Sequence, residues 1–398
     1  MQTKLASALT ILSTALTAVA VAVFAVGPSV AIGIVTISGL AFLAWLAIGT
    51  PSDAASDRVV APYLFSIPLL LVLQTFRYLS GWVGMLEESY KPLFAARFAI
   101  NDGNWFFALI CLPVCFMLLG GYYLSRRQHI GHCMAWWTAL WVIAEGLLQL
   151  WIGLLGGRPL TPLTFLGGAA AIGLMFNGVV ICQRFLSGKA AAQVSAQAPA
   201  PVSSYQLNLW TVLFLALVAV YAVNMYRSAG PVPVAIISGS MLGGMVGWRL
   251  TTARRPADPA WAVPLFLLLL TMFYLHVGEE AITDFAKAVS GITGVPWTER
   301  NFMIDIALVG PIFWFAAAWS LWKRQPFGNF IFWFLIVGMI LGEPAHVLTF
   351  PIMAMRKFGI GYEYFSGMYT ALFPMIPAII ALVTIVRLHR RSSTTVAA

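Results

Sequence analysis

Charge is the scarcest property of this 398-residue chain. Only 9% of its residues are Asp, Glu, Lys or Arg, against roughly a quarter in soluble globular domains. That scarcity excludes an ordinary soluble enzyme, and it equally excludes a disordered chain, which needs low hydrophobicity and high net charge. With 60% hydrophobic residues and a mean hydropathy of +0.87, the composition indicates a protein whose main solvent is lipid.

Acidic residues and cysteines are also few, with 14 Asp and Glu against 23 Lys and Arg, and only four Cys. The net charge of +9 would suggest a nucleic-acid partner in a soluble domain. Here it is better assigned to loops that orient the chain in the bilayer, and we expect no nucleic-acid binding. The cysteines lie in or beside apolar stretches, where thiols serve as small apolar filler. They are Cys111, Cys115, Cys133 and Cys182.

Long hydrophobic runs, by contrast, are abundant. A helix needs about 20 largely apolar residues to span a bilayer. Twelve such runs predict an all-α, polytopic membrane protein with twelve transmembrane helices. The runs cover residues 5–27, 29–49, 59–83, 103–124, 133–155, 161–185, 207–226, 231–249, 260–282, 302–322, 328–348 and 362–386.

The two halves of the chain resemble copies of each other. Pro113 and Pro311 lie inside the fourth and tenth runs, and Glu145 and Glu343 lie late in the fifth and eleventh. Both pairs have the same offset, since 311 − 113 and 343 − 145 both give 198. Six helices per half is an even number, so the pattern predicts a parallel 6+6 tandem duplication. We predict an N-terminal six-helix repeat over 1–186, a cytoplasmic linker rich in Ala, Gln, Ser and Pro over 187–205, and a C-terminal six-helix repeat over 206–398.

The distribution of charge predicts the orientation. If the N-terminus is cytoplasmic, most Lys and Arg fall on cytoplasmic segments, as membrane proteins prefer. Only three acidic residues, Asp53, Asp57 and Asp258, fall on that side. We therefore expect both termini on the cytoplasmic side of the membrane.

Ionisable residues inside apolar helices are costly and are candidates for function. His276, Glu279 and Glu280 end the ninth run, and their spacing of three and four residues predicts that both carboxylates lie on the His face of the helix. Glu343 and His346 lie late in the eleventh run, also three residues apart. Pro344 between Glu343 and His346 is expected to distort the turn.

Asp305, one turn into the tenth run, completes the set. Under the predicted topology the ninth and eleventh helices run outward and the tenth runs inward, so all these groups reach a similar depth in the outer leaflet. We predict one site in the C-terminal repeat that contains His276, Glu279, Glu280, Asp305, Glu343 and His346. Tyr274, Trp297, Asn301, Tyr364 and Tyr369 are the expected substrate-binding residues.

The string from His276 to Glu280 (His-Val-Gly-Glu-Glu) resembles the motif that names the HXXEE family of bacterial membrane proteins. Further similar pieces follow in the same order: Arg300-Asn301-Phe302, Asp305 where the family often has Asn, His346, and the string from Tyr364 to Ala371, in which Ser366 replaces a Pro. The resemblance covers roughly residues 260–386. It implies a helical bacterial membrane protein, and hence the inner membrane, but no activity.

The N-terminal half keeps carboxylates and lacks both imidazoles. Glu87 and Glu88 match the acidic pair, but Gly84 stands at the position of His276, and Leu148 stands at the position of His346. The first copy is therefore expected to be a degenerate, mainly structural site. Arg77, late in the third run, is expected to snorkel or to pair with Glu87 or Glu88.

Three functions fit this pattern. In the first, an integral membrane enzyme isomerises or cyclises a lipophilic small molecule (sterol-, terpenoid- or lipid-like) by His/Glu acid–base chemistry. Glu279 or Glu343 would exchange protons with the substrate, and the two histidines would act as relays. Nearby aromatic side chains would line the pocket and stabilise positive charge.

The second function is metal binding. Glu-x-x-His facing a second His/carboxylate helix is similar to the spacing in di-iron bundles, and mixed His and carboxylate ligands suit Zn, Fe or Mn. The expected ligands are His276, Glu279, Glu280, Glu343 and His346. The third function is proton-coupled transport, because parallel six-helix repeats and intramembrane His and Glu occur in secondary carriers. A purely structural buried network is the remaining alternative.

Overall fold

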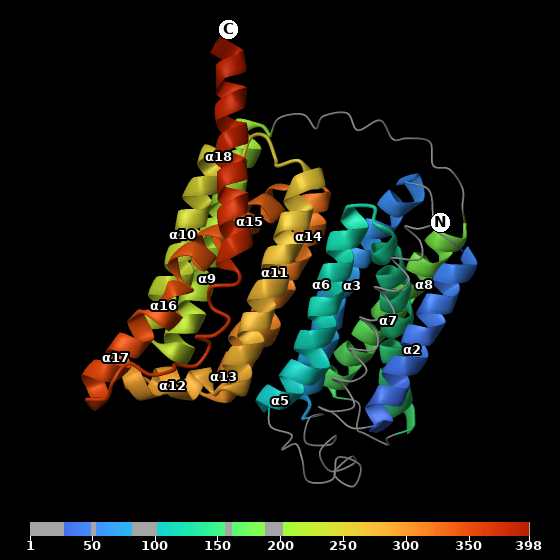
Figure 1. Cartoon of the computed structure of the whole chain (residues 1–398), viewed down its shortest axis with the longest axis horizontal. Coiled ribbons are helices and arrows are strands. Elements are labelled where there is room, and N and C mark those ends of the chain that lie inside the picture. The colour runs from blue at the N-terminus through green and yellow to red at the C-terminus, as the bar shows by residue number, and fades with distance from the viewer. Residues whose placement is uncertain (1–27, 49–52, 82–101, 156–160, 188–201, 398) are drawn as a thin grey trace. The chain divides into compact units, whose positions relative to one another are not determined.

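The computed structural model describes residues 28–48, 53–81, 102–155, 161–187 and 202–397 (Figure 1). Every regular element in these ranges is a helix, which confirms the prediction of an all-α protein. Nine helical stretches of the described chain are long and apolar enough to cross a membrane, as expected of a multi-pass membrane protein. They are Asp57–Leu79, Gly103–Ser125, His129–Trp151, Phe165–Leu186, Ser204–Ala229, Pro231–Leu250, Pro259–Ile282, Glu299–Trp322 and Pro326–Phe358.

The count of twelve spans stays a prediction, because the first predicted run, 5–27, lies outside the described residues. The last predicted run, 362–386, needs a correction. Helix α18 (Met375–Ala397) begins thirteen residues later than 362, and 359–374 are turns and irregular backbone. Gly359 ends the preceding helix at φ 68°, and Gly367 at φ 82° is incompatible with the negative φ of an α-helix.

The chain forms two compact units, Met1–Ala196 and Gln197–Ala398. In unit 1, α7 packs against α6 and α8, and α3 packs against α8. The described helices of unit 1 are α2 (Pro28–Ile48), α3 (Asp53–Leu79), α5 (Asp102–Phe106), the π-helix η1 (Phe107–Cys111), α6 (Leu112–Ser125), α7 (His129–Leu155) and α8 (Pro162–Leu186). Three of the four cysteines are buried and all four are unbridged, consistent with their interpretation as apolar filler.

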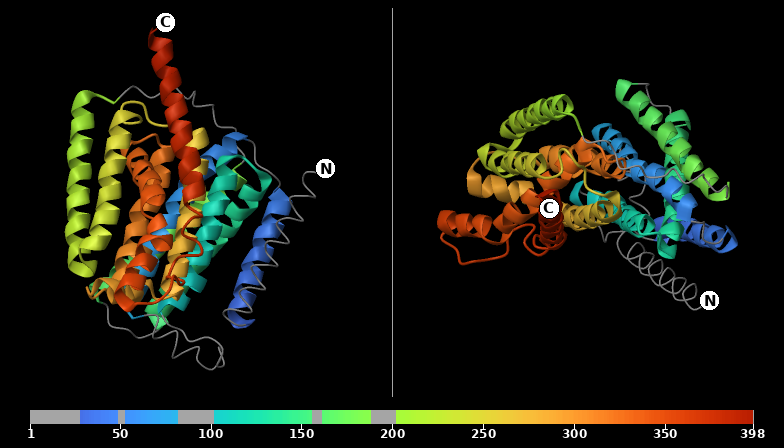
Figure 2. Two further views of the ribbon diagram at one scale, coloured as in Figure 1. Left: turned by 60° about the vertical axis from the view of Figure 1, so that its left-hand side comes forward. Right: turned by 90° about the horizontal axis from the view of Figure 1, so that it is seen from above.

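Unit 2 is built around α15, which contacts α10, α14 and α18 (Figure 2). Helix α11 packs against α14 and α18, and the short α12 lies nearly crosswise to the long helices at one end of the unit (Figure 1). The helices are α9 (Ser204–Ala229), α10 (Pro231–Leu250), α11 (Pro259–Ile282), α12 (Phe285–Thr293), α13 (Glu299–Phe302), the π-helix η2 (Met303–Val309), α14 (Gly310–Trp322), α15 (Pro326–Leu341), α16 (Pro344–Val347), α17 (Thr349–Phe358) and α18.

The contact between α10 and α15 depends on a small residue. A Cβ on Gly244 would lie 2.5 Å from the backbone N and Cα of Phe334. Small residues at such crossings let helix backbones approach closely in lipid, where van der Waals packing drives association.

Gly244→Ala is therefore expected to force α10 and α15 apart and to destabilise the protein by about 1–3 kcal/mol, the usual cost of overpacking. Gly239→Ala on the same helix is the matched control, since a Cβ there would have nothing within 4 Å. Thermal unfolding in detergent measures both variants. Equal melting temperatures would contradict this account of the α10–α15 contact.

Two backbone carbonyls of the π-helix η2 accept hydrogen bonds from tyrosine side chains of neighbouring helices. A π-turn disrupts the regular i→i−4 ladder, and unpaired carbonyls are costly in an apolar surrounding. The hydroxyl of Tyr221 donates to the carbonyl of Asp305 at 3.0 Å, and that of Tyr274 donates to the carbonyl of Ala307 at 2.9 Å. Two tyrosines from α9 and α11 thereby hold η2 in place.

Candidate His/Glu site

The end of α11 supplies the first three ionisable groups. His276, Glu279 and Glu280 are all buried on a helix whose preceding residues are almost entirely apolar. His276 and Glu280 are one helical turn apart and face each other, with 3.7 Å between Nε2 and Oε1. Glu279 is rotated by about 100° from Glu280, because an α-helix has 3.6 residues per turn. The two adjacent carboxylates therefore point to different neighbours.

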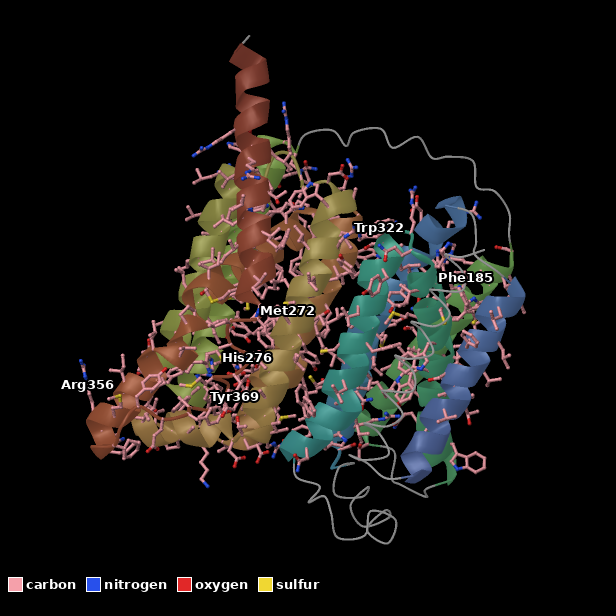
Figure 3. All side chains as sticks on the ribbon, in the orientation of Figure 1. Phe185, Met272, His276, Trp322, Arg356 and Tyr369 are labelled. Atoms are coloured by element: carbon pink, nitrogen blue, oxygen red, sulfur yellow. The ribbon has the colours of Figure 1, made fainter. Side chains whose placement is uncertain are left out.

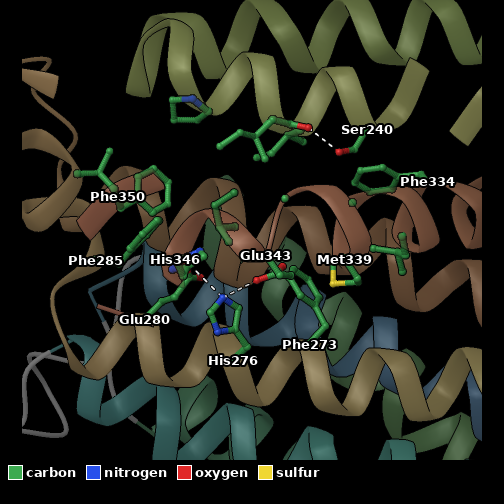
Figure 4. Close-up of a pocket in the computed structure, with 18 of the residues that line it drawn as sticks. Ser240, Phe273, His276, Glu280, Phe285, Phe334, Met339, Glu343, His346 and Phe350 are labelled. Atoms are coloured by element: carbon green, nitrogen blue, oxygen red, sulfur yellow. Dashed lines mark hydrogen bonds and ion pairs between the residues drawn. The ribbon is translucent and has the colours of Figure 1, made fainter. Parts of the chain in front are cut away.

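A break between α15 and α16 supplies the other two groups. Pro344 has no N–H and cannot continue the hydrogen-bond ladder of α15, which ends at Leu341. The chain resumes as α16 only after the turn at Glu343, and the backbone N–H of His346 bonds to the carbonyl of Glu343 at 3.1 Å. The distortion predicted from Pro344 is present, and it turns both Glu343 and His346 toward α11 (Figure 4).

These elements bring four ionisable side chains together. His276 Nε2 lies 2.9 Å from Glu343 Oε2, and His346 Nε2 lies 3.4 Å from Glu280 Oε1. The two imidazole rings meet edge to face, with centroids 4.6 Å apart. The cluster of His276, Glu280 and His346 offers one nitrogen or oxygen each within 4.8 Å of one another. A His/Glu cluster is therefore present in the C-terminal half, and it contains four of the six residues predicted for the site.

Two of these close atoms are not hydrogen-bonded. Although His276 Nε2 and Glu343 Oε2 are only 2.9 Å apart, their geometry is not that of a hydrogen bond, and both buried atoms have no hydrogen-bond partner. Few buried polar atoms in native proteins have no hydrogen-bond partner, and each such atom needs an explanation.

Glu279 is held by the segment that follows α17. Its carboxylate accepts hydrogen bonds from the Tyr364 hydroxyl at 2.7 Å, from the Tyr369 N–H at 3.1 Å, and from both the N–H and the hydroxyl of Thr370, at 2.8 and 2.5 Å. Burial and the bond to Glu279 raise the pKa of Tyr364 to about 12, so this tyrosine keeps its proton and stays a donor. Glu279 thus anchors the 364–370 segment at the end of α11. Figure 3 labels Tyr369 of this segment near His276 of α11.

The same segment contacts both imidazoles. Thr370 Oγ1 lies 3.1 Å from His276 Nδ1, and the Ser366 carbonyl lies 3.0 Å from His346 Nδ1. Between them Gly367 passes so close that a Cβ there would lie 2.7 Å from His346 Nδ1 and 2.9 Å from His276 Cε1. Ser366, Gly367 and Thr370 were not among the predicted site residues, although they lie in the string from Tyr364 to Ala371 that carries the family resemblance.

A cavity of about 110 Å³ opens beside the cluster. His276, Glu280, Glu343 and His346 form its polar wall, and nearly all of the remaining lining is apolar or aromatic (Figure 4). The large apolar side chains include Phe273, Phe285, Trp297, Trp314, Phe334 and Met339. Phe285 also stacks on His346, with ring centroids 4.9 Å apart, and so fixes the plane of that imidazole.

Of the five predicted substrate-binding residues, one lines the cavity and four do not. Trp297 lines the cavity. Tyr274 is buried and its hydroxyl bonds to η2, and the backbone of Asn301 is capped by Thr298 at the start of α13. Tyr364 and Tyr369 stack on each other with centroids 4.5 Å apart and hold Glu279. None of these four lines the cavity.

Asp305 lies in a separate environment from the His/Glu cluster. Its Oδ1 accepts a hydrogen bond from Asn224 of α9 at 2.8 Å, and its side chain does not line the cavity. The buried Oδ2 has no hydrogen-bond partner. The depth of Asp305 in the predicted helix was therefore a poor guide to the neighbours of its side chain.

Unit 1 contains an ion pair between Arg77 and Glu145. Glu145, the predicted counterpart of Glu343, lies 2.5 Å from Arg77 Nη1. Gln149 and Gln74 also accept hydrogen bonds from Arg77. The predicted partners Glu87 and Glu88, like Gly84, lie outside the described residues.

No family model, curated protein or solved structure matches this chain. The resemblance to the HXXEE family therefore stays a prediction.

Proposed function

We propose that the chain is an integral membrane enzyme that acts on a lipophilic small molecule of sterol, terpenoid or lipid type. The proposed chemistry is proton transfer at the His/Glu cluster, as in an isomerisation or cyclisation. One observation carries this proposal: four buried His and Glu side chains form one wall of an otherwise apolar cavity. Such sites bind the bulk of a ligand by apolar contact and orient it by a few polar groups.

The size of the cavity limits what it holds. An apolar cavity of this order accommodates a group about as large as benzene. The proposed ligand therefore places one ring or a short branched segment beside the cluster, with the rest of the molecule outside the cavity. The aromatic lining stabilises positive charge that develops on a protonated hydrocarbon.

Glu343 is the proposed acid or base. It lines the cavity, and its Oε2 is buried without a hydrogen-bond partner, so this oxygen remains accessible to a substrate atom. Glu279, the other carboxylate considered from sequence, accepts four hydrogen bonds and does not line the cavity. Its proposed role is to position His276 through Thr370.

Photoaffinity labelling tests ligand binding. The purified protein, in nanodiscs, is irradiated with a clickable diazirine analogue of an isoprenoid or of a fatty acid, and the adducts are mapped by mass spectrometry. We expect adducts on cavity residues such as Phe273 or Phe334, and we expect Met339→Trp to remove them by filling the cavity. Leu341→Trp is the matched control, because Leu341 is 72% exposed on the outside of the same helix. Adducts only on such outer positions would contradict the proposal.

Turnover separates binding from chemistry. Incubation with a bacterial lipid extract, followed by mass spectrometry, identifies the molecule that is converted. Glu343→Gln is expected to keep the cavity adducts and to lose at least about 100-fold in turnover, the usual contribution of a general acid or base. Unchanged turnover would remove Glu343 from the proposed role.

The proposal places the enzyme in a bacterial inner membrane, with both termini cytoplasmic and twelve spans arranged as two parallel six-helix repeats. Features internal to each unit support the repeat. A π-helix precedes the matched prolines Pro113 and Pro311 in both units. Arg127 and Arg324, just after α6 and α14, both have φ 56°. Each forms an ion pair with an aspartate near the start of α3 or α11, namely Asp57 and Asp258.

A further inference from the structure

We infer that the His/Glu cluster is a binding site for one divalent transition-metal ion. The proposed ligands are His276 Nε2, His346 Nε2 and Glu280 Oε1, and the Glu343 carboxylate lies beside them with its proposed role as acid or base unchanged. This inference deepens the proposed function, since it names a cofactor for the same site, and its first test does not depend on activity.

The distances within the cluster are close to those between ligands of one metal ion. With metal–ligand bonds of about 2.0–2.2 Å, neighbouring ligand atoms lie about 2.8–3.1 Å apart in an octahedral shell and about 3.3–3.6 Å apart in a tetrahedral one. The separations found are 3.4 Å from His346 Nε2 to Glu280 Oε1 and 3.7 Å from His276 Nε2 to Glu280 Oε1, and one ligand atom from each of the three residues lies within 4.8 Å of the other two. Both distances to Glu280 are longer than the range of about 2.7–3.2 Å that is usual for a hydrogen bond.

The hydrogen bond at His346 fixes which nitrogen offers a lone pair. Its Nδ1 lies 3.0 Å from the Ser366 carbonyl, and a carbonyl oxygen only accepts, so Nδ1 carries the proton. In the neutral imidazole Nε2 is then the unprotonated nitrogen, and Nε2 is the atom that faces Glu280. Histidine ligands of metals commonly donate their second nitrogen to a backbone carbonyl in this way.

His276 is oriented by a second chain of hydrogen bonds. The Thr370 hydroxyl donates to Glu279 at 2.5 Å, and Glu279 already accepts from two backbone N–H groups. Thr370 Oγ1 therefore has only a lone pair for His276 Nδ1, 3.1 Å away, and Nδ1 is the donor. In the neutral ring Nε2 is then unprotonated and points into the cluster, and the Glu279 carboxylate orients this ring through the Thr370 hydroxyl.

In the neutral form of both imidazoles, the Nε2 lone pairs face carboxylate oxygens, which offer only more lone pairs. Two atoms of the cluster, His276 Nε2 and Glu343 Oε2, are buried and have no hydrogen-bond partner. A cation bound by His276, His346 and Glu280, beside the Glu343 carboxylate, supplies the missing positive charge. Two imidazoles with carboxylates suit Zn²⁺, Fe²⁺ or Mn²⁺ better than Cu⁺, which prefers sulfur, or Ca²⁺, which prefers oxygen. Such an ion would polarise an oxygen of a bound substrate.

Elemental analysis tests the site. The full chain is purified in detergent with a histidine-free affinity tag and without chelator, and its metal content is measured by mass spectrometry. We expect about one equivalent of transition metal, lost on EDTA treatment together with a lower melting temperature. Co²⁺ added to the stripped protein is expected to give visible absorption bands of a His/carboxylate site. His346→Ala and Glu280→Gln should each lower metal affinity at least tenfold, whereas His389→Ala, at an exposed histidine of α18, should not.

The outcomes are distinct. Folded wild-type protein that purifies without metal and binds no added Co²⁺ overturns the metal site, and leaves a hydrogen-bonded cluster with one protonated imidazole. This test uses the wild-type protein, so its result does not depend on whether a variant folds. Metal-free protein that still takes the photoaffinity label in the cavity would overturn the metal and keep the proposed function. Metal-loaded protein that takes no photoaffinity label in the cavity would overturn the proposed function and keep the metal site.

Discussion

Gly367→Ala is expected to dismantle the His/Glu cluster while the long helices stay folded. Gly367 has φ 82°, a left-handed conformation that costs a residue with a Cβ roughly 1–2 kcal/mol. The new Cβ would also lie 2.7 Å from His346 Nδ1 and 2.9 Å from His276 Cε1. Both rings are held in place, because His346 stacks on Phe285 and is bonded to Ser366, and His276 Nδ1 is bonded to Thr370. The 364–370 segment must therefore move away from both histidines.

The measurement combines a melting temperature with two site readouts, metal content and photoaffinity labelling of the cavity. We expect at least a tenfold loss in both site readouts and a melting temperature only a few degrees lower. Gly361→Ala is the matched control on the same connection, since a Cβ there has nothing within 4 Å and the residue has no left-handed φ. Wild-type labelling and metal content in Gly367→Ala would show that the close approach of this segment is unimportant.

Breaking the Arg77–Glu145 ion pair is expected to destabilise the protein by about 3–5 kcal/mol, the cost of leaving one buried charge unpaired. Arg77 is only 2% exposed and Glu145 is 13% exposed. Arg77 also donates to Gln149 at 2.8 Å, so a lost guanidinium leaves more than one acceptor without its donor. Arg77→Met and Glu145→Leu should each show the full loss.

The double variant Arg77→Met/Glu145→Leu separates charge from packing. Because apolar replacement of both members of a buried ion pair is often neutral, we expect it to regain much of the stability lost in either single variant. The control is the Arg127–Asp57 pair, which is 47% and 44% exposed; Asp57→Asn should cost no more than about 1 kcal/mol. Unfolding in mixed SDS micelles measures all four proteins. A double variant as unstable as the sum of the singles would exclude a charge-pair explanation.

The sequence predicted much of the His/Glu cluster because its parts are local. His276 and Glu280 are one turn apart on an apolar helix, and Glu343 and His346 flank a proline whose effect on a helix is known. Both relations are between residues only three or four positions apart in the sequence. The family resemblance also contained Gly367 and Thr370, but a motif alone does not say which atoms touch.

For Asp305 and Glu279, helical spacing did not predict the neighbours of the side chain. The depth of Asp305 placed it near the cluster, but depth does not fix the direction of a side chain around the helix axis. The π-helix η2 changes the residues per turn at that point, and Asp305 bonds to Asn224 of α9. Glu279 was expected beside His276 at the site, but its carboxylate is occupied by a segment about 90 residues later in the chain.

The sequence by itself determined that this is an all-helical protein of long apolar spans, and that its few ionisable groups gather in certain helix ends. It did so because span length and apolar content follow directly from the bilayer. Only the tertiary structure decided which of those groups share one cavity, which carboxylate stays without a hydrogen bond, and how Gly367 reaches both histidines. These relations join α11, the α15–α16 break and the 364–370 segment, and contacts between such distant segments follow no sequence period.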